Sequence, residues 1–130
     1  MGSEMCIRDR SIRNWTDCQP YIGHDNILIH HILGPKGRGD GGDSARLEGE
    51  WALHRHSIQP GKQGDFHTHK SEHVFFVLAG TGKIQLGDKL YDIKVGDAVH
   101  VEPDIGHQNF NTGDSWLDLL VITSFSHVKD

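Results

Sequence analysis

The strongest signal in this chain is segment 61–80, which reads GKQGDFHTHKSEHVFFVLAG. In a β-strand, residues two positions apart project from the same face, so His67 and His69 can aim two imidazoles at one point. His73 follows shortly after and opens the apolar run at 74–78. Because a bend before that strand would bring its ring back beside the pair, the segment predicts a cluster of three imidazoles.

A fourth histidine comes from segment 106–111, which reads GHQNFN. This residue, His107, follows a predicted short strand at 98–101, and closure of a sheet would place it beside the other three. Histidine is the commonest side chain among metal ligands, and several converging at one point are typical of a metal site. The chain has 11 histidines in 130 residues, which also favours imidazole chemistry.

The rest of the chain predicts an all-β fold in a single domain. Its 130 residues suit one ordinary domain, and 16 glycines with 35% hydrophobic residues favour short strands separated by turns. Glycine-rich turns at 80–82 and 87–88 are expected to form hairpins, and 11–18 can form a short turn of helix. This pattern is typical of a sandwich or small barrel. The expected strands lie at 26–33, 50–59, 74–78, 83–86, 90–93, 98–101 and 117–124.

Charge and hydropathy exclude two classes of partner. The formal net charge is −5, and the 13 Lys and Arg residues form no basic stripe, so nucleic acid is not an expected partner. The apolar runs at 74–79 and 119–122 are far shorter than the roughly 18 residues that cross a bilayer, so no membrane association is expected.

The cysteines and the first ten residues indicate the compartment and the domain boundary. Cys6 and Cys18 are too few for a disulfide framework and predict free thiols in a reducing compartment, hence a cytoplasmic location. Residues 1–10 resemble a tag or non-native leader, so the folded domain is expected over 11–130.

Taken together, these residues resemble the cupin family. The first cupin motif has the form G-x5-H-x-H-x3-E-x6-G, and it aligns here without gaps. Its positions fall on Gly61, His67, His69, His73 and Gly80. The resemblance implies a jelly-roll barrel, also called a double-stranded β-helix, with a metal ion inside.

The second cupin motif, G-x5-P-x-G-x2-H-x3-N, is matched with two departures. Gly96, His107 and Asn111 occupy the expected positions. Glu102 and Asp104 stand where the family has Pro and Gly, so the turn before His107 is expected to differ in detail. The two motifs together give a resemblance over about residues 50–125, which are the expected barrel core.

The glutamate position of the first motif is occupied by His73. The neighbouring Glu72 is the rival ligand, but in a strand over 74–78 it would face away from the side that carries His73. The resulting set resembles the four-histidine subgroup of small bacterial cupins, some of which bind manganese and some of which have been assigned oxygenase-type chemistry. The implied metal ligands are His67, His69, His73 and His107.

Four neutral ligands would leave a divalent metal its full charge, which favours Lewis acidity and attracts anionic, oxygen-bearing substrates. Imidazole suits several metals. The resemblance favours Mn or Fe, with Zn, Ni or Cu as alternatives. Four ligands on an octahedral ion would leave two positions for a bidentate substrate, or for substrate and dioxygen.

Strand alternation predicts a mostly apolar cup beside the metal. If His73 faces the interior, so do alternate residues of its strand, and the charge of Asp118 places the odd-numbered residues of the last strand inward. His56 and His100 are candidate pocket residues, and together with Glu102 they are candidate general acids or bases. The candidate pocket residues are His56, Phe75, Val77, His100, Leu117, Leu119 and Val121. No role is assigned to His24, His30, His31, His54 and His127.

These observations favour a metal-dependent enzyme, a dioxygenase-like oxidoreductase acting on a small organic molecule. The sequence contains no nucleophile elbow, and neither cysteine adjoins a motif, so covalent nucleophilic catalysis is not expected. A non-redox isomerase or lyase, or a non-catalytic ligand-binding module, is the alternative, because the fold hosts many functions. The resemblance also implies a homodimer, in which the apolar strand at 27–33 would cross to the neighbour.

Overall fold

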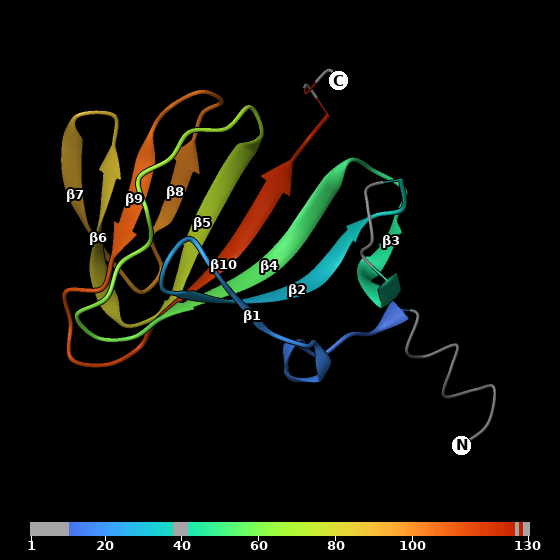
Figure 1. The fold of residues 1–130 in the computed structure, drawn as a ribbon, viewed down its shortest axis with the longest axis horizontal. Coiled ribbons are helices and arrows are strands. Elements are labelled where there is room, and N and C mark those ends of the chain that lie inside the picture. Colours follow the sequence, from blue (N-terminus) through green and yellow to red (C-terminus); the bar gives the residue numbers. More distant parts are fainter. Residues whose placement is uncertain (1–10, 38–41, 127, 129–130) are drawn as a thin grey trace.

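Strands in two sheets make up most of the described chain (Figure 1). The structure is a computed structural model, and it describes residues 11–37, 42–126 and 128. Two short 3-10 helices, η1 (Trp15–Asp17) and η2 (Gly42–Ser44), accompany the strands. The strands are β1 (Tyr21–Gly23), β2 (Ile27–Pro35), β3 (Ala45–Leu47), β4 (Trp51–Ile58), β5 (Glu72–Ala79), β6 (Thr81–Leu86), β7 (Lys89–Lys94), β8 (Ala98–Val101), β9 (His107–Phe110) and β10 (Leu117–Ser124).

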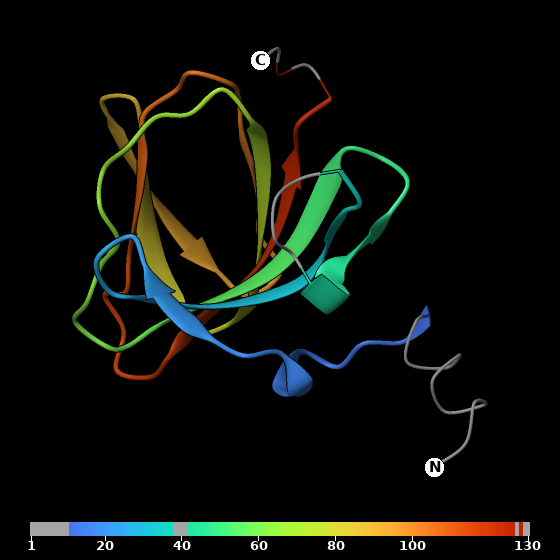
Figure 2. The ribbon, with the colours of Figure 1, turned by 45° about the vertical axis from the view of Figure 1, so that its right-hand side comes forward.

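The two sheets enclose one hydrophobic core. The larger sheet has the strand order β1-β2-β4-β10-β5-β8, with β3 beside β2, and the smaller has the order β7-β6-β9. Figure 2 shows the sheets facing each other around a common interior. Phe75 and Leu119 from the larger sheet pack in one cluster with Ile84 and Ile93 from the smaller. The prediction of a single-domain, all-β jelly-roll is therefore confirmed.

The alternation of buried and exposed residues in β5 and β10 shows which side chains face the interior. Phe75 and Val77 are buried in β5, whereas Phe76 and Leu78 on the other face are exposed. In β10 the inward positions are Leu117, Leu119, Val121 and Thr123, all of them buried. Because these strands are neighbours, their inward faces form one continuous wall.

Strand β10 positions residues that lie far apart in the chain. It pairs antiparallel with β4 on one edge and with β5 on the other. Val121 stands opposite His54 of β4 and Phe75 of β5, and Thr123 stands opposite His73. His54 and His56 of β4 and His73 at the start of β5 are thereby brought onto the same wall.

Two local predictions from the sequence are wrong. Segment 66–69 is not a regular strand, because only His67 pairs there, in an isolated bridge with His107. Segment 80–82 is not a hairpin turn, because β5 and β6 belong to different sheets and Gly80 carries the chain from one to the other. The turn at 87–88 does join a hairpin, that of β6 and β7.

Strand β2 pairs with other strands of its own chain. It pairs with β4 over most of its length and with β1 and β3 at its two ends. Ile27 and Ile29 are buried in the core. Residues 27–33 pair within the chain here, and both the homodimer and the crossing of this strand to a neighbouring subunit stay predictions.

The ends of the chain are only partly described. The expected leader at 1–10 lies outside the described residues, as does His127. Within the described part, no helix is long and apolar enough to cross a bilayer.

Gly80 is required where the chain passes between the sheets. Its φ of 84° lies in the left-handed region, and a Cβ there would sit 2.4 Å from the backbone oxygen of Trp116. Gly87 in the β6–β7 turn also has a positive φ, 61°, but a Cβ there meets nothing within 4 Å. Substitutions at the two glycines therefore distinguish the cost of backbone strain, present at both, from the cost of a steric clash, present at Gly80 alone of the two.

We expect Gly87→Ala to lower the free energy of unfolding by about 1–2 kcal/mol through backbone strain alone. Gly80→Ala should cost about 1–3 kcal/mol more, because the added methyl group also overlaps backbone that cannot move aside. Urea denaturation followed by tryptophan fluorescence measures both. Equal losses for the two variants would contradict the close approach at Gly80.

Candidate metal centre

Backbone hydrogen bonds hold the loop that carries His67 and His69. The amide of His67 donates to the carbonyl of His107 at 3.1 Å, and the amide of His107 donates back to His67 at 3.0 Å. The amide of Asp104, in the turn between β8 and β9, donates to the carbonyl of His69 at 2.9 Å. The loop is thus fixed to β9 and to the turn before it, although it is not a strand itself.

Asp104 keeps the turn that the second motif ordinarily forms with glycine. Its φ is 66°, in the left-handed region, which aspartate adopts more readily than most residues. The departure from the motif at this position therefore leaves the loop contact in place.

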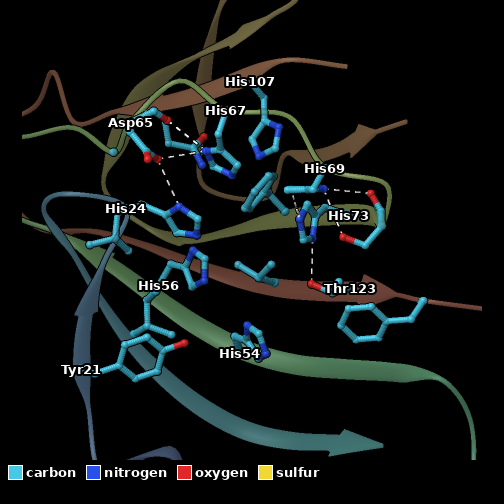
Figure 3. Close-up of a pocket in the computed structure, with 18 residues that line it drawn as sticks. Tyr21, His24, His54, His56, Asp65, His67, His69, His73, His107 and Thr123 are labelled. Carbon is cyan, nitrogen blue, oxygen red and sulfur yellow. Dashed lines mark hydrogen bonds and ion pairs between the residues drawn. The ribbon is translucent and has the colours of Figure 1, made fainter. Parts of the chain in front are cut away.

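Four imidazoles, those of His67, His69, His73 and His107, lie close together in the pocket (Figure 3). One ligand nitrogen from each of His67, His69 and His107 lies within 4.8 Å of the other two, so these three can hold a metal ion. The ring of His73, at the start of β5, lies edge-on to that of His69 with 4.0 Å between centroids, and 5.7 Å from that of His107. The structure brings all four predicted ligands together.

In each of the four rings, Nδ1 faces an oxygen atom. Main-chain carbonyls stand 3.2 Å from Nδ1 of His67, 3.0 Å from that of His69 and 3.3 Å from that of His107. A carbonyl only accepts, so each of these Nδ1 atoms carries the proton and donates it. Nε2 is then left with a free lone pair, which is the form in which histidine binds a metal.

His73 differs because its Nδ1 faces a hydroxyl group. The Oγ1 atom of Thr123 lies 2.7 Å away and can donate or accept. The Nε2 atoms of His73 and His69 are within hydrogen-bond distance, and His69 has its proton on Nδ1, so here the Nε2 of His73 donates to His69. With a metal bound, the other tautomer is needed, and the same hydroxyl can accept from Nδ1. The donor set therefore fits a metal ion.

Burial keeps three of these rings neutral, those of His69, His73 and His107. Desolvation, followed by the neighbouring imidazoles His69 and His107, lowers the pKa of His73 to about 3. Desolvation, followed by His67, lowers the pKa of His107 to about 4, and desolvation also lowers that of His69. Neutral rings at pH 7 are ready to bind a cation without first losing a proton.

Asp65 links the cluster to His24. Its Oδ1 lies 3.0 Å from Nδ1 of His67 and 3.1 Å from Nδ1 of His24, and the rings of His24 and His67 are stacked with 4.3 Å between centroids. Partial burial would raise the pKa of Asp65, but the charges and hydrogen bonds of His67 and His24 together lower it. An ionised carboxylate behind His67 fixes the orientation of that ring and strengthens it as a ligand.

The cluster opens into a cavity of about 230 Å³. Of the candidate pocket residues, His56, Phe75 and Val121 line it. Val77, Leu117 and Leu119 do not line it, because they face the core further along the barrel, where each is fully buried.

His100 does not belong to the pocket, so this prediction is wrong. In β8 the inward positions are Val99 and Val101, and His100 projects outward with its side chain 54% exposed. There its Nε2 is within hydrogen-bond distance of Glu72. Glu72 thus lies on the opposite face of β5 from His73, as the strand register predicts.

Several cavity residues have no predicted role. His54 could have been predicted from the sequence, because it shares the inward face of β4 with His56. The other cavity residues come close to the cluster only through contacts between distant parts of the chain. The remaining polar ones are Tyr21, His24, Asp65, Ser71, Asn109 and Thr123. Asp65 is the one carboxylate among the described residues that line the cavity.

Comparison with protein-family models identifies the family of this chain. The model of the Cupin domain matches residues 54–123, more than half of the chain. The chain is a cupin. The match begins at the first histidine of β4 and ends at Thr123, so it includes both motifs and all four converging histidines.

This cupin is similar to other proteins in sequence and in fold. It is 26% identical over 103 residues to an uncharacterised protein of Methanocaldococcus jannaschii, covering 78% of this chain and 76% of that one. The fold matches a predicted oxalate decarboxylase from Thermotoga maritima, with a TM-score of 0.71, 20% identity, and coverage of 87% and 97%. It also matches the polyketide cyclase RemF from Streptomyces resistomycificus, with a TM-score of 0.69, 20% identity, and coverage of 85% and 76%. At these identities the solved structures show the fold alone.

We expect the metal-free cupin to lose stability as the pH falls from about 7 towards 4. The folded-state pKa values of His73 and His107 lie below the ordinary 6.5, so the unfolded chain binds more protons in this window. The stabilisation is complete above 6.5 and declines through the folded values. Thermal unfolding in a chelator across this range measures it. His73→Leu should flatten the pH dependence, and an unchanged slope in that variant would contradict the buried neutral ring.

Proposed function

We propose that this cupin is a metal-dependent enzyme whose four-histidine centre, formed by His67, His69, His73 and His107, acts on a small organic molecule. The observation that carries the proposal is the pairing of every Nδ1 in the cluster with an oxygen atom. This arrangement leaves Nε2 of His67, His69 and His107 free for a metal, and His73 would join them in the tautomer that donates from Nδ1 to Thr123. Three of the oxygens are main-chain carbonyls, so the support is part of the fold.

The residues around the centre suit a small, oxygen-bearing substrate. Phe75 and Val121 give the cavity an apolar wall, which excludes water and strengthens electrostatic interactions inside it. Asp65, the one carboxylate among the described lining residues, is engaged through Oδ1 by His24 and His67. A bound divalent metal would act as a Lewis acid on substrate oxygen atoms and, as Mn or Fe, would support chemistry with dioxygen.

The reaction class proposed first is a dioxygenase-type oxidation. A non-redox isomerase or lyase is the second candidate, because His54 and His56 line the same cavity as the four converging histidines. Desolvation lowers the pKa of His54 to about 3 and that of His56 well below 6.5, so both rings are neutral near pH 7. Such low pKa values make both rings weak bases, so the non-redox candidate rests on their position beside the cavity and stays second to the oxidation.

We expect His73→Ala to weaken metal binding by more than about 100-fold, since it removes a ligand and not only its support. The matched control is Glu72→Ala at the adjacent position, which should change the affinity by less than about threefold, because Glu72 lies on the outer face with His100. Titration of the chelator-treated protein with Mn²⁺ or Zn²⁺ by calorimetry measures both. The reverse order of effects would show that the carboxylate is the ligand.

If the enzyme is a dioxygenase, protein reconstituted with Mn²⁺ or Fe²⁺ should consume oxygen in the presence of small oxygen-bearing substrates, and protein reconstituted with Zn²⁺ should not. An oxygen electrode with a panel of catechols, diketones and 2-oxo acids measures this. His107→Ala serves as the inactive control. Turnover without oxygen consumption would favour the non-redox reaction, and absence of turnover with every metal would exclude the oxygenase proposal for this panel.

A further inference from the structure

The cavity has a second polar region opposite the four-histidine centre. His54 and His56 lie two positions apart in β4, so both project from its inward face. Their rings are nearly parallel, with 6.0 Å between centroids. Figure 3 shows them on the β4 side of the cavity, beside Tyr21 and across from His69 and His107.

Both rings have hydrogen-bonding capacity that the described residues leave unused. Nε2 of His54 and Nδ1 of His56 are buried without a hydrogen-bond partner, and His56 as a whole is only 6% exposed. A buried polar atom without a partner costs about 1–3 kcal/mol. In contrast, the Nδ1 atom of every ring in the metal cluster has an oxygen partner. Of the five buried polar atoms without a partner among the described residues, three belong to side chains that line the cavity, those of His54, His56 and Asn109. A ligand group entering the cavity would supply the partner that the two histidines lack.

A structural role or a second metal explains these rings poorly. A buried histidine usually has a partner for its ring nitrogens. Nδ1 of His30 also lacks one away from the cavity, so what distinguishes His54 and His56 is their position in the cavity wall together with their missing partners. Among the described residues, the sets of three or more side chains that can hold a metal are those around His107 and around His24, and neither includes His54 or His56. The two rings are therefore suited to hydrogen bonds with a ligand.

Phe75 connects the two polar regions. Its ring centroid lies 6.2 Å from that of His56, 5.6 Å from that of His73 and 5.8 Å from that of His107. A ligand lying along this ring has the metal centre at one end and the paired histidines of β4 at the other. Its middle would contact the apolar surface of Phe75 and Val121.

We propose that His54 and His56 form a recognition site for a second oxygen-bearing group of the ligand, a carboxylate or a hydroxyl, at the end remote from the metal. The ligand class is thus a small molecule with oxygen atoms at both ends and an apolar or planar middle. This inference rests on the proposed metal-dependent function and names the class of molecule that the same site accepts.

The test compares matched 2-oxo acids whose common head group binds a metal and whose remote ends differ. Calorimetry on the Mn²⁺-loaded protein would measure Kd for 2-oxopentanoate, 5-hydroxy-2-oxopentanoate and 2-oxoglutarate, and for the corresponding six-carbon set. We expect at least one acid with a terminal oxygen group to bind at least tenfold more tightly than its methyl-terminated counterpart. The hydroxyl and carboxylate arms identify which group the site prefers.

The variants His54→Leu and His56→Leu should each reduce that preference to within about twofold while leaving the affinity for the methyl-terminated acid unchanged. His100→Ala, on the outer face, is the matched histidine control and should keep the full preference. Because a leucine removes an unpartnered buried nitrogen, we expect neither variant to unfold at a lower temperature than the parent. His54 is the less buried of the two, so its variant provides the result if the other fails to fold.

Metal content, measured first, separates the two proposals. Wild-type protein that holds no metal would overturn the proposed function and this inference with it. Metal-loaded protein that binds the methyl-terminated and oxygen-terminated acids equally at both lengths would overturn the inference alone, as would leucine variants that keep the preference.

Discussion

The pairing of β10 with two partners at once is the constraint on which the cavity depends. Its edges hold β4 and β5 in register, and these two strands supply His54, His56 and Phe75 along with one of the four converging histidines. Its own inward face supplies Val121 and Thr123. A slip of one residue on either edge would turn a whole row of these side chains outward, so register and site geometry are specified by the same hydrogen bonds.

Much of this arrangement follows from the chain itself. The run of short strands and turns predicted an all-β fold, and the resemblance of the two motifs to those of cupins predicted the jelly-roll barrel and the set of four histidines. Alternation could also have excluded His100, because Val99 and Val101 on either side are the apolar positions of β8. That prediction failed because it weighed the residue type above the strand pattern.

Other features could not be predicted because they depend on contacts distant in sequence. Thr123 supports His73 only because two strands 50 positions apart pair in one register. His24 reaches Asp65 through the fold of the β1–β2 turn over the cavity, and no spacing rule links these two residues. The bridge between His67 and His107 likewise replaces the strand that was expected, since the barrel closes through a loop there.

The oxygen atoms behind the histidine rings differ in how they can be lost. A carbonyl of the main chain survives every side-chain replacement, so the partners of His67, His69 and His107 at Asp65, Ser71 and Ile105 persist under point mutation. The hydroxyl of Thr123 does not. Over evolutionary time the three carbonyls would persist, and metal affinity would be adjusted through the side chains that support the rings, such as the hydroxyl of Thr123 and the carboxylate of Asp65.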